Sequence, residues 1–162
     1  MDICTRKVIG FAVHEGPVDG FALRCMFAKV ISGREPRYIC HDNDPLFHSW
    51  WWQSLAGCLF HGDESREIWS VPYTPVSNPY VERLIGTVRR EFLDHTLFWN
   101  RIDLEQKLSM YQEYYNDARV HRSLCGQIPS QWANEQEVKI ADIKNYKWKT
   151  HCRGLFRNPV AA

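Results

Sequence analysis

Two acidic side chains stand out because of where the predicted secondary structure places them. Asp42 directly follows Arg37–His41, a short apolar run that predicts a buried strand, and functional residues gather at the carboxyl ends of strands in α/β sheets. Glu82 lies in the first turn of a predicted helix over Asn78–Phe92. Such a carboxylate pair can hold Mg²⁺ ions that activate a water or a hydroxyl for attack on a phosphodiester. A structural interpretation also fits, in which Asp42 caps a turn and Glu82 complements the positive end of its helix.

The segment Asn78–Phe92 is the clearest helix in the sequence. Asn78 is a good N-cap, and Pro79 suits the first helical position, where its missing N–H is not needed. Gly86 lies one turn beyond Glu82, where the absence of a side chain would keep the space beside the acid open. Apolar side chains recur every three or four residues and therefore share one face, formed by Val81, Leu84, Ile85, Val88 and Phe92.

The remaining segments predict strands that alternate with helices, which indicates an α/β architecture. Besides Arg37–His41, short apolar runs predict strands at Lys7–Val13 and Ile68–Val71. Helices are expected from Asp19 to about Gly33, over Ser49–Leu59, from Asp103 onward with Gln106 at capping-box spacing, and near Gln131–Ile143. The helix from Asp103 should bury Leu104, Leu108, Tyr111 and Tyr115.

Length and composition fit one globular domain. The chain has 162 residues, of which 44% are hydrophobic, so we expect a single domain over residues 1–162. Its α/β core should span 1–100, and C-terminal helices and a tail should span 101–162. The net charge of +1 argues against a histone-like DNA binder, although a local basic patch could still hold DNA. The sequence shows neither a signal peptide nor an apolar run of about 18 residues, which predicts a cytoplasmic protein.

Three ordered motifs resemble the catalytic core of DDE transposases and retroviral-type integrases, the integrase core domain family. They are the helix Asn78–Glu91 (NPYVERLIGTVRRE), the loop Asp42–Phe47 (DNDPLF), and a downstream segment with Tyr115, Asn116, Arg119, His121, Ser123, Leu124 and Pro129. The resemblance implies an RNase H-like fold, a bacterial mobile element, and a D-D-E triad that holds two Mg²⁺ or Mn²⁺ ions for DNA strand transfer. By position, Asp42 corresponds to the second acid and Glu82 to the third, and both would be catalytic and metal-binding.

The first acid of the triad has no clear counterpart. Asp2–Arg6 (DICTR) resembles the family's D-x-x-[ST]-R motif, which joins the second strand to the third, whereas the first acid lies a hairpin earlier. We therefore expect an amino-terminally truncated core that lacks the first strand and most of the second. Two acids should bind Mg²⁺ or Mn²⁺ weakly, if at all. The expected function is a DNA-binding or self-associating module without strand-transfer activity, a homodimer formed through the strand at Lys7–Val13.

Two alternatives stay open at this point. The chain could be an active Mg²⁺-dependent strand-transferase subunit that receives the missing acid from another chain or from an upstream segment. It could also be an unrelated metal-dependent nuclease or a structural protein.

Two basic clusters are candidates for contact with DNA. Arg83, Arg89 and Arg90 neighbour Glu82 in sequence, and a second cluster contains Arg119, His121 and Arg122. In the family's context such residues line DNA, where phosphate contacts make the affinity depend on salt. A plain solvated helix face explains these charges about as well.

Overall fold

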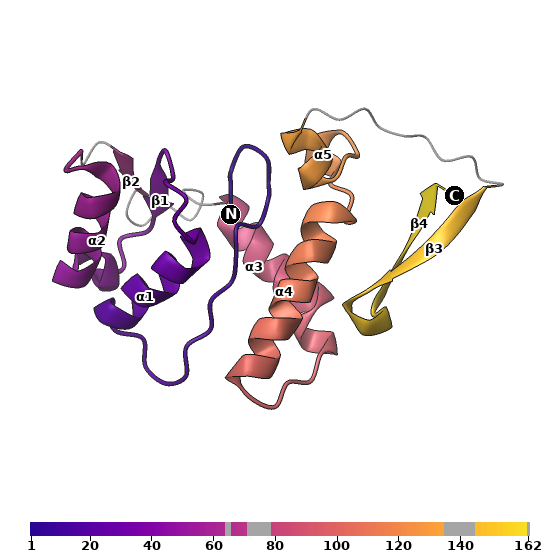
Figure 1. The fold of residues 1–162 in the computed structure, drawn as a ribbon, viewed down its shortest axis with the longest axis horizontal. Helices are drawn as coiled ribbons and strands as arrows, with labels where there is room; N and C mark the ends of the chain where they lie inside the picture. The colour runs from indigo at the N-terminus through magenta and orange to yellow at the C-terminus, as the bar shows by residue number, and fades with distance from the viewer. Residues whose placement is uncertain (64–65, 71–78, 135–144, 162) are drawn as a thin grey trace. The chain divides into compact units, whose positions relative to one another are not determined.

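The computed structural model describes residues 1–63, 66–70, 79–134 and 145–161, which separate into two compact units. One unit is Ala12–Leu97, and the other joins Met1–Phe11 to Phe98–Ala162 (Figure 1). The boundary at residue 98 lies close to the subdivision expected near residue 100, but the first eleven residues go with the C-terminal part. The single domain predicted over 1–162 stays a prediction.

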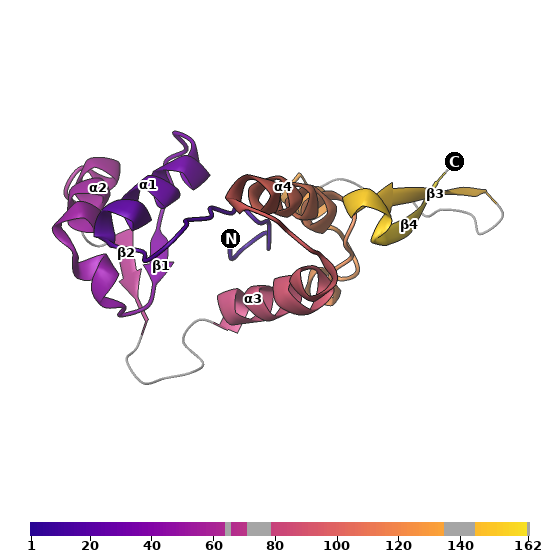
Figure 2. The same cartoon turned by 90° about the horizontal axis from the view of Figure 1, so that it is seen from below.

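The unit Ala12–Leu97 is built from helices and one short parallel strand pair. In order it contains α1 (Gly20–Ile31), β1 (Ile39–His41), the 3-10 helix η1 (Pro45–His48), α2 (Trp50–Phe60), β2 (Glu67–Trp69), α3 (Pro79–Glu91) and the 3-10 helix η3 (Leu93–His95). Strands β1 and β2 are parallel, and Cys40 lies opposite Ile68. Helices α1 and α2 lie side by side (Figure 2). The predicted order of elements is therefore confirmed in this unit.

Side-chain caps explain where α1 and α2 begin. The Asp19 carboxylate accepts the Ala22 N–H at 2.7 Å, and the Ser49 hydroxyl accepts the Trp52 N–H at 3.4 Å. Between the two helices and β1 lies a core of Ile39, Trp52, Ala56 and Phe60, packed against Leu23, Phe27, Phe47, Leu55 and Leu59. Trp52 is the fully buried member of the run Trp50–Trp52, because only its side chain faces this core. This core fixes β1 and thus the start of the loop that carries Asp42.

The second unit is organised around the long helix α4 (Arg101–Asp117). The elements that follow are the 3-10 helix η4 (Arg122–Leu124), α5 (Pro129–Ala133), β3 (Tyr146–His151), the 3-10 helix η5 (Cys152–Gly154) and β4 (Phe156–Ala161). Strands β3 and β4 form an antiparallel hairpin that packs on α4 (Figure 1). The sequence analysis did not predict this hairpin.

Three structural predictions are wrong in detail. Lys7–Val13 forms no strand in the described structure; α4 holds its backbone instead, through side-chain amides. Helix α4 begins two residues before Asp103, because Asn100 is the N-cap and accepts the Asp103 N–H at 2.9 Å. Ile85 points away from the buried face of α3, with 62% of its surface exposed, whereas Leu84, Val88 and Phe92 are buried.

Some predictions fall outside the described residues. These include the cap Asn78, the end of the third strand at Val71, and most of Gln131–Ile143, of which α5 covers the beginning. Within the described ranges, no helix is long and apolar enough to cross a membrane.

Candidate functional site

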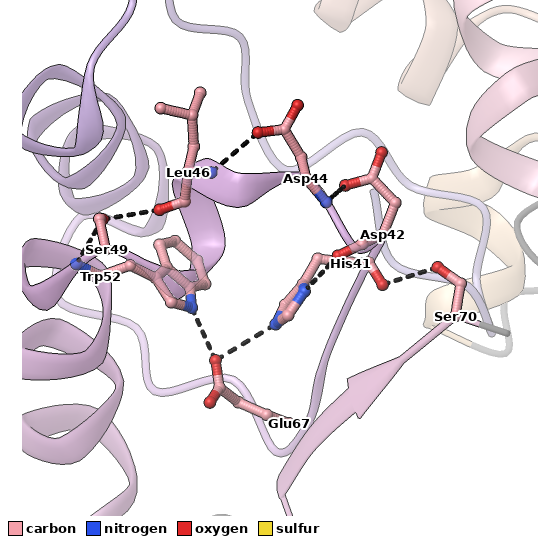
Figure 3. A network of polar contacts seen from close by, with 8 residues as sticks. All are labelled: His41, Asp42, Asp44, Leu46, Ser49, Trp52, Glu67 and Ser70. Atoms are coloured by element: carbon pink, nitrogen blue, oxygen red, sulfur yellow. Dashed lines mark hydrogen bonds and ion pairs between the residues drawn. The ribbon is translucent and has the colours of Figure 1, made fainter. Parts of the chain in front are cut away.

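Asp42 stands where the sequence places it, in the loop directly after β1. Its exposed carboxylate accepts the Asp44 N–H at 3.2 Å, and the Asp44 carboxylate accepts the Leu46 N–H at 2.9 Å and so caps η1 (Figure 3). Two successive side-chain caps therefore shape this loop. The second oxygen of Asp42 is directed away from the cap in Figure 3, so an exposed oxygen ligand stands at the end of the strand.

A buried polar network holds the strand end behind Asp42. Glu67 on β2 accepts a hydrogen bond from Trp52 Nε1 at 2.7 Å, and the same carboxylate oxygen lies 3.2 Å from Nε2 of His41 (Figure 3). The other ring nitrogen of His41 lies 3.0 Å from the Asp42 carbonyl oxygen. The amide and the hydroxyl of Ser70 both donate to the His41 carbonyl, at 2.9 and 2.7 Å. The residue before Asp42 is therefore fixed through both its side chain and its backbone.

Aromatic rings enclose this network. The His41 imidazole stacks on Phe47, with centroids 4.4 Å apart, and meets the edges of Trp52 and Trp69. A cavity of about 550 Å³ adjoins the network and is lined by Phe47, Glu67, Trp69 and the Gln53–Phe60 side of α2. Neither Asp42 nor Glu82 lines it, so this cavity is not the place where the two acids would act.

Glu82 occupies the first turn of α3, as predicted, and its side chain is exposed. A Cβ atom on Gly86 would lie 3.0 Å from Nη1 of Arg90, so the Arg90 guanidinium runs back along the helix over this glycine. The missing side chain thus makes room for an arginine. Arg83 and Arg89 are exposed on the same helix, so α3 carries three cations close to Glu82 in the sequence.

The second basic cluster is only partly exposed. His121 is buried, and its ring packs edge to face with Tyr115, with ring centroids 4.6 Å apart. Its Nε2 atom lies 3.5 Å from Nη1 of Arg119. Arg119 also lies over the Tyr115 ring. Arg122 is exposed. Of the three residues, Arg122 and Arg119 offer charge to a ligand, and His121 supports Arg119.

Asp2 uses its carboxylate within its own turn. It accepts hydrogen bonds from the Cys4 N–H and the Thr5 hydroxyl, both at 2.8 Å. Partial burial acts to raise the pKa of this carboxyl, but the hydrogen bonds from Thr5 and Cys4 prevail and hold the pKa below its ordinary value. Asp2 belongs to the unit that contains α4, whereas Asp42 and Glu82 belong to the other unit.

Asp42 and Glu82 have side chains of the right chemistry to bind a divalent cation, but two carboxylates are fewer than the three acids of a complete centre. Asp42 and Glu82 offer the hard oxygen ligands that Mg²⁺ and Mn²⁺ prefer. Across the part of the chain that the structure describes, no group of three or more His, Cys, Asp or Glu side chains comes together as a metal site. The described residues therefore do not assemble a complete three-acid centre.

Part of the chain matches a known protein family. A family model described as integrase core domain matches residues 66–129, the stretch from β2 to the start of α5. Residues 66–129 are an integrase core segment. The predicted resemblance to the DDE transposase and integrase core is thereby confirmed.

A curated protein and a solved structure are each similar to most of this chain. The chain is 30% identical over 129 residues to an uncharacterized 39.2 kDa protein of insertion element IS476 from Xanthomonas euvesicatoria. It is also similar to a chain in the simian T-cell lymphotropic virus intasome, solved in complex with the PP2A regulatory subunit B56 gamma, with a TM-score of 0.59 and 22% identity. The matches cover 80% and 84% of this chain, but only 36% of the insertion-element protein and 50% of the intasome chain. The fold is of the RNase H-like integrase class that the sequence predicted.

Sequence reasoning missed Glu67, the acid that joins His41 to Trp52. It starts a strand of only three residues, and its register opposite Ile39 is what brings it beneath the Asp42 loop. An isolated acid before the short apolar pair Ile68 and Trp69 was the only signal in the sequence.

Proposed function

We propose that this chain is a DNA-binding, self-associating module of the integrase type and that it performs no strand transfer by itself. The match to the integrase core domain over residues 66–129 carries the proposal, because that stretch contains Glu82 and all of the candidate DNA-binding residues. These are Arg83, Arg89, Arg90, Arg119 and Arg122, with His121 behind Arg119.

Helix α3 is the proposed contact with duplex DNA. Its three arginines are exposed in whole or in part, and guanidinium groups bind phosphate oxygens through directed hydrogen bonds. Phosphate contacts of this kind position a protein on DNA without reading its sequence. The expected binding is therefore independent of sequence and sensitive to salt.

The small number of acids available as metal ligands supports the absence of strand transfer. Mg²⁺ or Mn²⁺ would be held by Asp42 and Glu82 alone and therefore weakly, since hard ions need several oxygen ligands. Asp2 uses its carboxylate in a local turn. Bound divalent ions would supply Lewis-acid activation of an attacking hydroxyl. The chain's own contribution is to hold Asp42 through the His41–Glu67 network.

An active Mg²⁺-dependent strand-transferase subunit is the second candidate. The exposure of both Asp42 and Glu82 favours it, because neither carboxylate is buried. A third acid would then come from another chain or from an upstream segment.

The N-terminal segment is the proposed contact between two copies. Hydrogen bonds from α4 reach Val8 and Ile9, whereas Gly10–Val13 pair with no strand in the described structure and are half-buried. Edge pairing with a second copy would satisfy this backbone, and two-fold dimers are the commonest closed assembly. Light scattering at micromolar concentration should give a dimer, and Phe11→Pro, which removes one backbone donor, should shift it to the monomer. A monomeric wild-type chain would remove self-association from the proposal.

Duplex binding is tested with a matched pair of triple variants. Replacing Arg83, Arg89 and Arg90 with Gln should weaken binding to a labelled duplex in fluorescence anisotropy. It should also reduce the slope of log K against log salt by about 0.9 for each phosphate that is no longer neutralised. The control replaces Arg24, Arg34 and Arg37 with Gln, which removes the same charge elsewhere in the same unit. Equal decreases in affinity in both variants would mean that overall charge, and not α3, accounts for the binding.

A further inference from the structure

The hairpin β3–β4 concentrates positive charge in a chain that is close to neutral. Residues 145–161 contain Lys147, Lys149, Arg153 and Arg157 and no aspartate or glutamate, whereas the whole chain has a net charge of only +1. In the described structure, Lys147, Lys149 and Arg157 form no ion pair with another described residue. Arg153 is different, because its charge acts on Asp103 of α4. Three cations are therefore available to a polyanion.

The strand register sorts the hairpin side chains onto two faces. Directly paired residues of an antiparallel pair point to the same side, and alternate residues share a face. Because Trp148 lies opposite Pro159 and Thr150 lies opposite Arg157, one face carries Tyr146, Trp148, Thr150 and Arg157. Lys147 and Lys149 alternate with these residues and therefore lie on the other face. Trp148 is 61% exposed and Tyr146 is 41% exposed.

The other face anchors the hairpin to α4. The ring of Phe156 stacks on Tyr114 with centroids 4.0 Å apart and planes within 3°. Asn158 Nδ2 donates to the Ala118 carbonyl at 2.7 Å, and His151 also contacts Tyr114. With one face held on the helix, the face with Tyr146 and Trp148 is the one presented outward. The exposed aromatic face thus lies on a hairpin that is anchored to α4.

We propose that this outward face, with Tyr146, Trp148 and the exposed Arg157, is a binding site for single-stranded DNA. A cation that forms no ion pair with another described residue can bind a phosphate, and exposed aromatic rings give unpaired bases a surface on which to stack. A duplex would leave the rings without a partner, because its base faces are already stacked on one another. Tyr146 and Trp148 meet edge to face at 5.5 Å, so Trp148 is the main stacking surface and Tyr146 supports it.

This site goes beyond the proposed duplex contact. It lies outside residues 66–129 and needs neither Asp42 nor Glu82. The hairpin belongs to the unit that contains α4, whereas α3 belongs to the other unit, so each surface can fail independently of the other.

The test measures single-strand binding by the full chain in EDTA. The probe is fluorescein-labelled oligo-dT of about 16 nucleotides, the upper end of common site sizes, and a blunt duplex serves as the comparison. Trp148→Ala should weaken oligo-dT binding by about 5- to 150-fold, as expected when a base–aromatic stack is removed, and Trp148→Phe should weaken it less. Arg157→Gln should reduce the salt slope by about 0.7.

Two controls isolate the hairpin. Trp99→Ala removes another tryptophan, which is 85% exposed and lies outside the hairpin, and Arg34→Gln removes one charge elsewhere. Both control variants should bind oligo-dT with a Kd within about twofold of the wild-type value. This change is smaller than the one expected when a base–aromatic stack is removed. Unchanged affinity in Trp148→Ala would overturn the proposal, as would an equal decrease for oligo-dT and duplex. Binding to anionic lipid vesicles without binding to oligo-dT would also overturn it.

Discussion

Glu67 is the residue on which the position of Asp42 most depends. It accepts a hydrogen bond from Trp52 and contacts His41, and its side chain is 13% exposed. Removing one partner from a buried polar group leaves the other partners unsatisfied, which costs about 1–3 kcal/mol. The carboxylate therefore links α2, β1 and β2 at the point where the Asp42 loop begins.

Glu67→Ala should lower the free energy of unfolding by about 1–3 kcal/mol in urea titrations, because Trp52 Nε1 and His41 lose their partner. Glu35→Ala is the matched control. Glu35 pairs with Arg66 at 2.9 Å, but its side chain is 53% exposed, so its removal should cost below about 1 kcal/mol. Equal losses of unfolding free energy in the two variants would show that the Glu67 network stabilises the fold no more than a surface ion pair does.

Gly20 marks the closest approach between α1 and the start of α2. A Cβ atom there would lie 2.4 Å from the Ser49 hydroxyl oxygen and 2.7 Å from its Cβ. Gly20→Ala should therefore destabilise the unit by about 1–3 kcal/mol through overpacking. Gly57→Ala, in the middle of α2 with open space around the new methyl group, should instead stabilise it by about 0.5–1 kcal/mol. Thermal melts that rise for both variants would contradict the close packing.

The sequence could place Asp42 and Glu82 because each follows a strong local pattern. Asp42 ends a short apolar run, and Glu82 opens an amphipathic helix with a proline at its first position. The sequence could not reveal the Glu67 contact, because that contact depends on a strand register 26 positions away. It also could not show that His121 is buried, since the burial comes from the fold of the segment after α4.

At the scale of elements, α4 takes the place of a strand partner for the N-terminal segment. Asn116 Oδ1 accepts the Val8 N–H at 2.8 Å, and Asn116 Nδ2 donates to the Val8 carbonyl at 3.0 Å. Gln112 Nε2 donates to the Ile9 carbonyl at 3.1 Å. Within the apolar run Lys7–Val13, Val8 is almost fully buried and the other residues are half-buried. The strand prediction was wrong because side-chain amides supply the hydrogen bonds, which no pattern in the run itself could show.

Asn116→Leu should destabilise the chain by about 2–4 kcal/mol, since it leaves two buried backbone groups of Val8 without their main partner. Hydrogen exchange should show a selective decrease of protection at the Val8 amide. Gln112→Ala is the comparison, because its amide donates only to carbonyls in a half-buried setting, and a smaller destabilisation is expected. If the Val8 amide keeps its protection in Asn116→Leu, the amide clamp does not hold this segment.

Cys152 reports on the docking of the hairpin against α4. Burial raises the pKa of its thiol to about 11, with a further contribution from Glu113 on the helix. Since the thiolate is the reactive form, alkylation by iodoacetamide at pH 8 should be about 100-fold slower than for a thiol of ordinary pKa. Mass spectrometry should find Cys152 modified after the exposed Cys4, Cys25, Cys58 and Cys125. Early modification of Cys152 would mean that the hairpin does not stay on α4.

At the scale of the whole molecule, the chain combines an integrase core segment with a proposed nucleic-acid surface on each of its two units. The α3 arginines lie in one unit, and the β3–β4 hairpin lies in the other. The motifs predicted the fold class because they are ordered along most of the chain. They did not predict the hairpin, because its alternating lysines and aromatics resemble a polar tail.

We expect this chain to bind DNA without catalysing strand transfer. Asp42 and Glu82 offer two hard ligands, and the described residues bring no group of three acids together as a metal site. Two-metal phosphoryl transfer needs both ions held in register, so DNA binding should persist in this chain without catalysis.

The most direct test incubates the purified chain with end-labelled duplex oligonucleotides and Mg²⁺ or Mn²⁺, and separates the products on a denaturing gel. We expect neither nicked nor joined strands, while the same samples bind the duplex in anisotropy. Robust metal-dependent nicking or joining that is abolished by Glu82→Gln would contradict the account. That result would establish the chain as an active strand transferase.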